Sequence, residues 1–126
     1  MKSNKPFSFI ESVRSFKYAF AGIINFFKTE HNALIHLLAT IAVLILAIAL
    51  HVSGMEIIAL VFAVGFVWVA ELFNTAIEKI MDFISEEQHP KIRVIKDISA
   101  AAVLIAAVVA LAVGCIVFIP KLSNLF

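Results

Sequence analysis

Three long apolar segments dominate the pattern of hydrophobic and polar positions along this chain. They cover residues 33–50, 57–77 and 98–119, and the second continues as one helical pattern to residue 84. Each is close to the roughly 20 residues that an α-helix needs to cross the hydrocarbon core of a bilayer. A membrane β-barrel would need a longer chain and strict alternation of apolar and polar positions. The pattern therefore predicts three transmembrane helices.

The connections between these predicted helices differ in length and charge. Residues 51–54 form a short turn, whereas residues 85–97 form a longer charged loop that contains Pro90. In this interpretation Asp97 caps the helix that starts after it, because aspartate is favoured at that position. Pro120 is expected to end the same helix, because proline lacks a backbone N–H.

A different pattern precedes the first apolar segment, over residues 8–29. Apolar side chains recur there at steps of three and four, and charged side chains lie largely on the other side. The apolar positions are Phe9, Val13, Phe16, Phe20, Ile23 and Phe27. This pattern predicts an amphipathic helix on the membrane surface, with a helix packed on the bundle as the alternative. A cleaved signal peptide is disfavoured, because no separate apolar core precedes residue 30.

Composition indicates an integral membrane protein with a single domain over residues 1–126. Hydrophobic residues make up 63% of the chain, charged residues 15%, and the mean hydropathy is +1.05. The formal net charge is +1 without a basic block, so nucleic acid is not expected as a partner. The single cysteine, Cys115, lies in an apolar run and is interpreted as a small hydrophobic residue.

The distribution of basic residues predicts the orientation in the membrane. The basic residues before the first apolar segment are Lys2, Lys5, Arg14, Lys17 and Lys28, and those around the 85–97 loop are Lys79, Lys91, Arg93 and Lys96. The turn at 51–56 has none. The positive-inside rule therefore places the N-terminus and the 85–97 loop in the cytoplasm and the C-terminus outside.

One stripe of polar side chains interrupts the second apolar segment. Glu71, Asn74, Thr75, Glu78 and Asp82 fall on one face of a helix that turns about 100° per residue. A carboxylate at the membrane interior costs roughly 2.5–3.5 kcal/mol on insertion scales. Glu78 and Asp82 reach the cytoplasmic interface, and Glu71 lies about 10 Å deeper. The stripe therefore predicts a functional site open to solutes and lipid together.

Charged residues from other segments are expected at the same depth as this stripe. Glu30 stands at the entrance to the first apolar segment, and Lys96 and Asp97 precede the third. Carboxylate oxygens suit Mg²⁺, which takes one or two carboxylates together with substrate phosphates. A deeper glutamate, Glu71, is suited to act as base on a lipid hydroxyl. Such a set favours phosphate transfer from a soluble nucleotide to a membrane alcohol.

Other interpretations of the same residues stay open at this point. The chain has four glycines, and their spacing excludes both glycine-rich phosphate-binding loops, so ATP would need another kind of site. Intramembrane Glu and Asn also mark ion pathways, and a small ion-coupled transport or membrane-complex assembly subunit is the alternative function. His36 is interpreted as a helix–helix hydrogen-bonding residue and Trp68 as a packing residue.

Small residues recur at every fourth position of the third apolar segment. The positions are Ala102, Ala106, Ala110 and Gly114. A stripe of this kind lets membrane helices approach closely. It predicts that helices pack closely along this face, but it does not predict how many subunits assemble.

The sequence Glu-Leu-Phe-Asn-Thr-Ala-Ile-Glu over residues 71–78 closely resembles the prokaryotic integral-membrane diacylglycerol kinase and undecaprenol kinase family. Asp82, the Glu-Gln-His of residues 87–89 and the Lys-Asp-x-x-Ala-Ala-Ala-Val of residues 96–103 extend the likeness. With Tyr18 and Glu30 it covers roughly residues 12–118. The resemblance implies an all-α homotrimeric bundle in the bacterial cytoplasmic membrane, with active sites shared between neighbouring subunits.

The resemblance also implies roles for individual residues. Glu71 would be the catalytic base at the acceptor hydroxyl, Asn74 would hold the site in shape, and Glu30 and Glu78 would bind the magnesium of MgATP. The residues implied to contact the nucleotide are Tyr18, Glu30, Glu78, Glu87, Gln88, His89, Lys96 and Asp97, with Asp82 as a further candidate. A branch of the family has an arginine where this chain has Glu11, so Arg14 or Lys17 would supply the basic contact.

The acceptor implied by the resemblance is diacylglycerol or undecaprenol, with ATP as phosphate donor. Residues 30–32, Glu-His-Asn, the Ile35-His36 pair and the His89-Pro90 pair look more like the undecaprenol branch.

Overall fold

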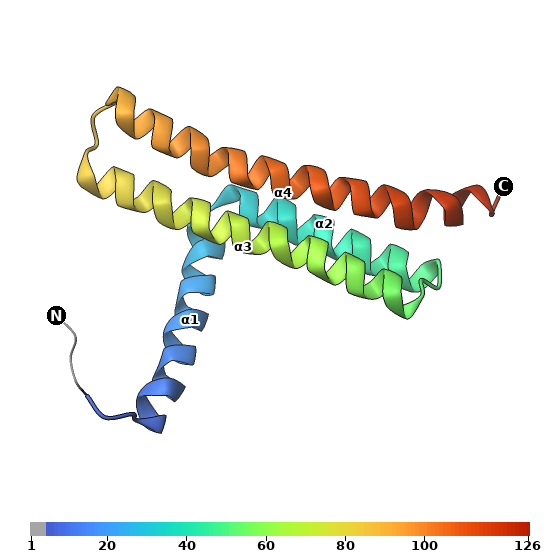
Figure 1. Cartoon of the computed structure of the whole chain (residues 1–126), viewed down its shortest axis with the longest axis horizontal. Coiled ribbons are helices and arrows are strands. Elements are labelled where there is room, and N and C mark those ends of the chain that lie inside the picture. The colour runs from blue at the N-terminus through green and yellow to red at the C-terminus, as the bar shows by residue number, and fades with distance from the viewer. Residues whose placement is uncertain (1–4) are drawn as a thin grey trace.

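Four helices form the computed structural model of the chain, which describes residues 5–126. They are α1 (Phe9–Thr29), α2 (His31–Ala49), α3 (Gly54–Ile84) and α4 (Pro90–Ser123), and the described residues contain no strand. Helices α2, α3 and α4 run alongside one another, and α1 leaves them at a steep angle (Figure 1). The predicted all-helical fold is confirmed. Lys2, one of the basic residues used for the orientation, lies outside the described residues.

Helices α2, α3 and α4 are long and apolar enough to cross a membrane, as predicted. Helix α3 has 31 residues. At 1.5 Å rise per residue it is about 46 Å long, and the hydrocarbon core of a bilayer is only about 30 Å thick. One end of α3 therefore extends beyond the hydrocarbon. Figure 1 shows the α3–α4 hairpin projecting past the start of α2.

A single residue, Glu30, forms the corner between α1 and α2. Its backbone is extended, with φ −112° and ψ 119°, and it caps the end of one helix and the start of the next. Its N–H donates to the carbonyl of Phe26 at 3.0 Å. Helix α1 begins after Ser8, whose side chain accepts from the N–H of Glu11. The corner places the Glu30 carboxylate where the two helices meet.

A tight turn joins α2 to α3 at the opposite end of the bundle. His51 has a positive φ of 52°. Ser53 then starts α3 with a capping box, in which its hydroxyl accepts from the N–H of Glu56 and the Glu56 carboxylate accepts from the N–H of Ser53. Two backbone donors are satisfied reciprocally, which fixes where α3 begins.

The connection between α3 and α4 is shorter than predicted, because only residues 85–89 are outside a helix. Helix α4 starts at Pro90, and its cap is His89, whose Nδ1 accepts from the N–H of Lys91 at 3.1 Å. The predicted loop over 85–97 and the predicted cap at Asp97 are therefore wrong. Proline suits the first helical position, since its missing N–H would have no partner there.

Pro120 does not end the last helix, which continues to Ser123. The N–H of Asn124 donates to the carbonyl of Pro120 at 3.3 Å. A proline this close to the end of a helix removes one N–H donor and leaves the last turn intact. The prediction that Pro120 closes the helix is wrong for that reason.

The buried apolar core lies toward the turn between α2 and α3. Leu60 of α3 packs there with Val117 and Phe118 of α4. Ala106, one of the predicted small residues, is fully buried within the chain, so this part of the stripe serves packing inside the subunit. Elsewhere large apolar side chains such as Phe62 point outward. Such a surface suits contact with lipid or another subunit.

Candidate functional site

Polar side chains of α3 form a buried row inside the helix bundle. Glu71 is 4% exposed, Thr75 6% and Asn74 9%. Glu78, one turn further along, is half-buried, and Asp82 is exposed. The polar stripe predicted from the sequence therefore runs from the interior of the helix bundle to its edge.

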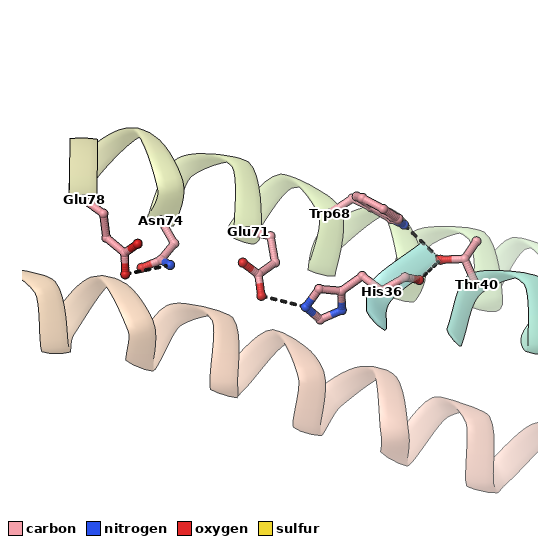
Figure 2. Close-up of polar contacts among 6 residues, drawn as sticks. All are labelled: His36, Thr40, Trp68, Glu71, Asn74 and Glu78. Atoms are coloured by element: carbon pink, nitrogen blue, oxygen red, sulfur yellow. Dashed lines mark hydrogen bonds and ion pairs between the residues drawn. The ribbon is translucent and has the colours of Figure 1, made fainter. Parts of the chain in front are cut away.

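The Glu71 carboxylate contacts a histidine of the neighbouring helix α2. Its Oε1 lies 2.6 Å from Nε2 of His36, a contact across 35 residues of sequence (Figure 2). The interpretation of His36 as a helix–helix hydrogen-bonding residue is confirmed. A hydrogen bond from an N–H donor offsets part of the desolvation of a buried carboxylate. The contact therefore stabilises the deepest member of the stripe.

Asn74 is held between α3 and α4. Its Oδ1 accepts a hydrogen bond from the Ser99 hydroxyl at 2.8 Å, and its Nδ2 lies 3.5 Å from Oε1 of Glu78. Figure 2 shows Asn74 and Glu78 side by side on α3. The amide thus joins α4 to the carboxylate that the family resemblance assigns to magnesium.

Glu30, the second carboxylate assigned to magnesium, has a basic partner from α3. Nζ of Lys79 lies 3.8 Å from Oε1 of Glu30 and donates to the Thr29 hydroxyl at 3.4 Å. Within residues 5–126, no group of three or more His, Cys, Asp or Glu side chains gathers to hold a metal ion. A magnesium site in this chain therefore needs oxygen ligands from outside this set, such as substrate phosphates.

The α3–α4 hairpin encloses a charged cavity of about 690 Å³ at its tip. The lining includes five residues that the resemblance assigns to the nucleotide, namely Glu87, Gln88, His89, Lys96 and Asp97. Arg93 and Asp82 also line it, and Nζ of Lys96 donates to Oδ1 of Asp82 at 2.5 Å. The fold thus brings the end of the polar stripe and these five residues to one place.

Five predicted nucleotide contacts do not line this cavity, namely Glu30, Glu78 and three residues of α1. Tyr18, Arg14 and Lys17 are exposed on α1, and Tyr18 is 70% exposed. Helix α1 leaves the bundle at a steep angle, which separates these side chains from the hairpin tip within one chain (Figure 1). Their roles stay predictions.

Two contacts of the site were not anticipated from the sequence. Ser99 lies among alanines and follows Lys96 by three residues, a spacing that places both on one side of α4. Lys79 directly follows Glu78, and its sequence position indicates only the orientation of the chain in the membrane. Trp68, interpreted as a packing residue, does pack against the rings of Phe26 and Phe27.

Comparison with known proteins agrees with the resemblance described above. Residues 17–118 match the family model described as prokaryotic diacylglycerol kinase. The chain is 37% identical over 109 residues to an undecaprenol kinase of Bacillus subtilis (strain 168), covering 86% of this chain and 89% of that protein. It is 36% identical over 112 residues to a diacylglycerol kinase of Synechocystis sp. (strain ATCC 27184 / PCC 6803 / Kazusa), covering 88% of this chain and 64% of that protein.

A diacylglycerol kinase of Escherichia coli (strain K12) is 29% identical over 114 residues, or 90% of this chain and 93% of its own length. With three apolar helices and a buried carboxylate at their centre, the fold and the site define a small multi-pass bacterial membrane protein. The chain belongs to the prokaryotic diacylglycerol kinase family, which is a family of membrane lipid kinases. An ion-coupled transport or assembly subunit is not favoured by these relatives.

Proposed function

We propose that this protein transfers the γ-phosphate of ATP to the hydroxyl of a membrane lipid alcohol, diacylglycerol or undecaprenol. The main support is that one helix face joins the buried Glu71 to Asp82 at the charged cavity. Eleven residues of helix separate them, or about 16 Å. That separation is comparable to the length of an extended nucleoside triphosphate. A base for the lipid and a pocket for the nucleotide therefore lie at opposite ends of one stripe.

In the proposed step Glu71 acts as general base on the acceptor hydroxyl. The lipid oxygen forms a bond to the γ-phosphorus while the bond from that phosphorus to the β,γ-bridging oxygen breaks, and ADP leaves. The hydroxyl proton goes to the Glu71 carboxylate and from there to solvent. Burial suits this role, because the contacts around a water-excluded carboxylate hold it in one orientation toward the acceptor hydroxyl.

The hairpin cavity is the proposed nucleotide site. Lys96 and Arg93 supply positive charge there, and Gln88 and His89 supply hydrogen-bonding groups for the base and sugar. The chain has no glycine-rich phosphate loop. Cationic side chains at the tip of the hairpin take its place, since Lys binds phosphate as a point charge and Arg as a fork.

Glu30 and Glu78 fit the donor set that Mg²⁺ prefers. Glu78 belongs to the polar stripe and Glu30 stands at the corner between α1 and α2, and the ion normally binds through one or two carboxylates plus substrate phosphates. When bound, Mg²⁺ neutralises charge that develops on the phosphate oxygens. Lys79 at 3.8 Å from Glu30 must shift away or turn toward the phosphates when the ion enters.

Helix α1 is proposed to lie on the cytoplasmic membrane surface. Its steep angle to the bundle supports this placement, because three spanning helices set the membrane normal (Figure 1). Large apolar side chains cover its exposed surface, as in Phe9 and Phe16. The hairpin tip with its basic residues then also faces the cytoplasm, where ATP is present.

A homotrimer with sites completed by neighbouring subunits is proposed as the working assembly. Most large apolar side chains of α2 and α3 are exposed in the single chain. Tyr18, Arg14 and Lys17 are far from the cavity of their own subunit and would serve a neighbour's site. Mixed oligomers of two inactive variants, one altered at Glu71 and one at Tyr18, should recover part of the activity if sites are shared.

The decisive experiment measures phosphate transfer from labelled MgATP by the purified protein in mixed micelles. Diacylglycerol and undecaprenol are offered in parallel, and Glu71→Gln is the control. Transfer to one lipid that disappears in the variant, with MgATP still bound, would establish the reaction and the acceptor. Absence of transfer to both lipids, together with absence of ATP binding, would contradict the proposal.

A further inference from the structure

The contact between His36 and Glu71 has features beyond those of a packing contact. The two atoms, Nε2 and Oε1, are 2.6 Å apart, and the side chains are 20% and 5% exposed. In residues 5–126 His36 is the one side-chain hydrogen-bonding partner of the Glu71 carboxylate. A buried carboxylate with a single donor depends on that donor for its orientation.

Thr40 and Trp68 make further contacts around His36, and Figure 2 shows the hydrogen bonds among these residues. The Thr40 hydroxyl donates to the backbone carbonyl of His36 at 2.7 Å, and Nε1 of Trp68 donates to that hydroxyl at 3.0 Å. The Trp68 ring also stands edge-on to the imidazole, with centroids 6.2 Å apart and an interplanar angle of 63°. Thr40 of α2 therefore contacts the backbone of His36, and Trp68 of α3 flanks its ring.

His36 also borders an apolar cavity of about 470 Å³ between α2, α3 and α4. His36, Thr40 and Trp68 are the polar or amphipathic side chains at that wall, and most of the remaining lining is aliphatic or small. Glu71 does not line the cavity. The imidazole thus contacts the Glu71 carboxylate and also borders this apolar cavity.

We infer that His36 is a positioning residue for phosphate transfer. Its Nε2–H donates to Oε1 of Glu71 and holds the carboxylate turned toward the acceptor hydroxyl. The inference rests on the proposed function, in which Glu71 takes that proton. Histidine partners of this kind commonly orient a functional carboxylate or are oriented by one.

The test compares two substitutions of His36 in the full-length protein. In His36→Gln the amide Nε2 still donates to Glu71 but does not titrate, whereas His36→Leu removes the donor. We expect His36→Leu to lower kcat about 10- to 100-fold with the KM for MgATP unchanged, since the nucleotide cavity does not include residue 36. His36→Gln should retain kcat within about threefold of the wild type, because donation and not proton uptake is required.

Thermal unfolding and yield in detergent separate a folding defect from a catalytic one. His51→Asn is the matched control, because it removes a histidine from the turn at the opposite end of the bundle and asparagine tolerates the positive φ of 52°. Wild-type kcat in His36→Leu would overturn the inference, as would a His36→Gln protein that is stably folded but as inactive as His36→Leu. If the wild type itself transfers no phosphate, the proposed function fails instead.

Discussion

The Ser99 hydroxyl of α4 donates a 2.8 Å hydrogen bond to Oδ1 of Asn74 on α3, and both side chains are buried. Because Oδ1 is occupied as an acceptor, Nδ2 is left to face Glu78, whose Oε1 lies 3.5 Å away. The orientation of an amide on one helix is thus set by a hydroxyl on the next. A small side chain at an unspecified position of the 96–103 sequence thereby orients a contact within residues 71–78.

Ser99→Ala should destabilise this arrangement. The substitution leaves the buried Oδ1 of Asn74 without its donor, which costs roughly 1–3 kcal/mol in free energy of unfolding. If Asn74 orients Glu78, the apparent affinity for magnesium should also fall, by about 10-fold. Thermal unfolding and a magnesium titration of activity measure the two effects. Ser123→Ala at the exposed end of α4 is the control, and equal stability of both variants would contradict the role of Ser99.

Glu78→Gln should raise the magnesium requirement sharply. The amide keeps the size of the side chain but removes the negative charge and one hard oxygen ligand that Mg²⁺ prefers. Initial rates at fixed ATP and increasing magnesium show the shift. Glu56→Gln, at the opposite end of α3 and paired with Lys121 at 3.1 Å, serves as the control. An unchanged magnesium dependence in Glu78→Gln would remove this residue from the metal site.

Lys96→Met should weaken the binding of MgATP. In the structure the Lys96 ammonium donates to Asp82 at the wall of the hairpin cavity, where it can exchange that carboxylate for a phosphate. Loss of a charged hydrogen bond of roughly 1.5–3 kcal/mol corresponds to a rise in KM for MgATP of about 10-fold or more. Steady-state kinetics measure it.

Lys91→Met is the matched control for that experiment. Lys91 lies five residues earlier on α4 and does not line the cavity. Removal of its charge should change KM by less than about twofold, because exposed charges away from a site contribute little. Equal effects of the two substitutions would indicate general electrostatic attraction and not a direct contact by Lys96.

Deletion of residues 1–28 should leave a protein that inserts into the membrane but lacks activity. The three spanning helices stay intact, whereas the packing of Phe26 and Phe27 against Trp68 is lost, and with it the support for the Glu30 corner. Membrane fractionation and the phosphate-transfer assay measure the two properties. Full activity of the truncated protein would exclude α1 from the mechanism.

The features that the sequence predicted correctly depend on local residue spacing or on the membrane environment. Apolar runs and the stripe from Glu71 to Asp82 follow from residue spacing alone, because backbone groups in a bilayer must be satisfied within a helix. The predictions failed at Pro90, Asp97 and Pro120, where charge, capping preference and proline were used to locate helix ends near the limits of the apolar runs. A helix that leaves the hydrocarbon keeps its backbone hydrogen bonds, so its ends do not coincide with the ends of the apolar run.

By itself the sequence determined the class of protein, the three spanning segments and the residues of the polar stripe. Only the tertiary structure decided their partners: His36 for Glu71, Ser99 for Asn74 and Lys79 for Glu30. These partners lie 35, 25 and 49 residues away in the chain. Helical periodicity shows which residues share a face of one helix, but it does not show how a second helix is rotated about its own axis against that face. The rotation is set by how the helices pack, where small residues such as Ala106 and the one-residue corner at Glu30 fix which faces meet.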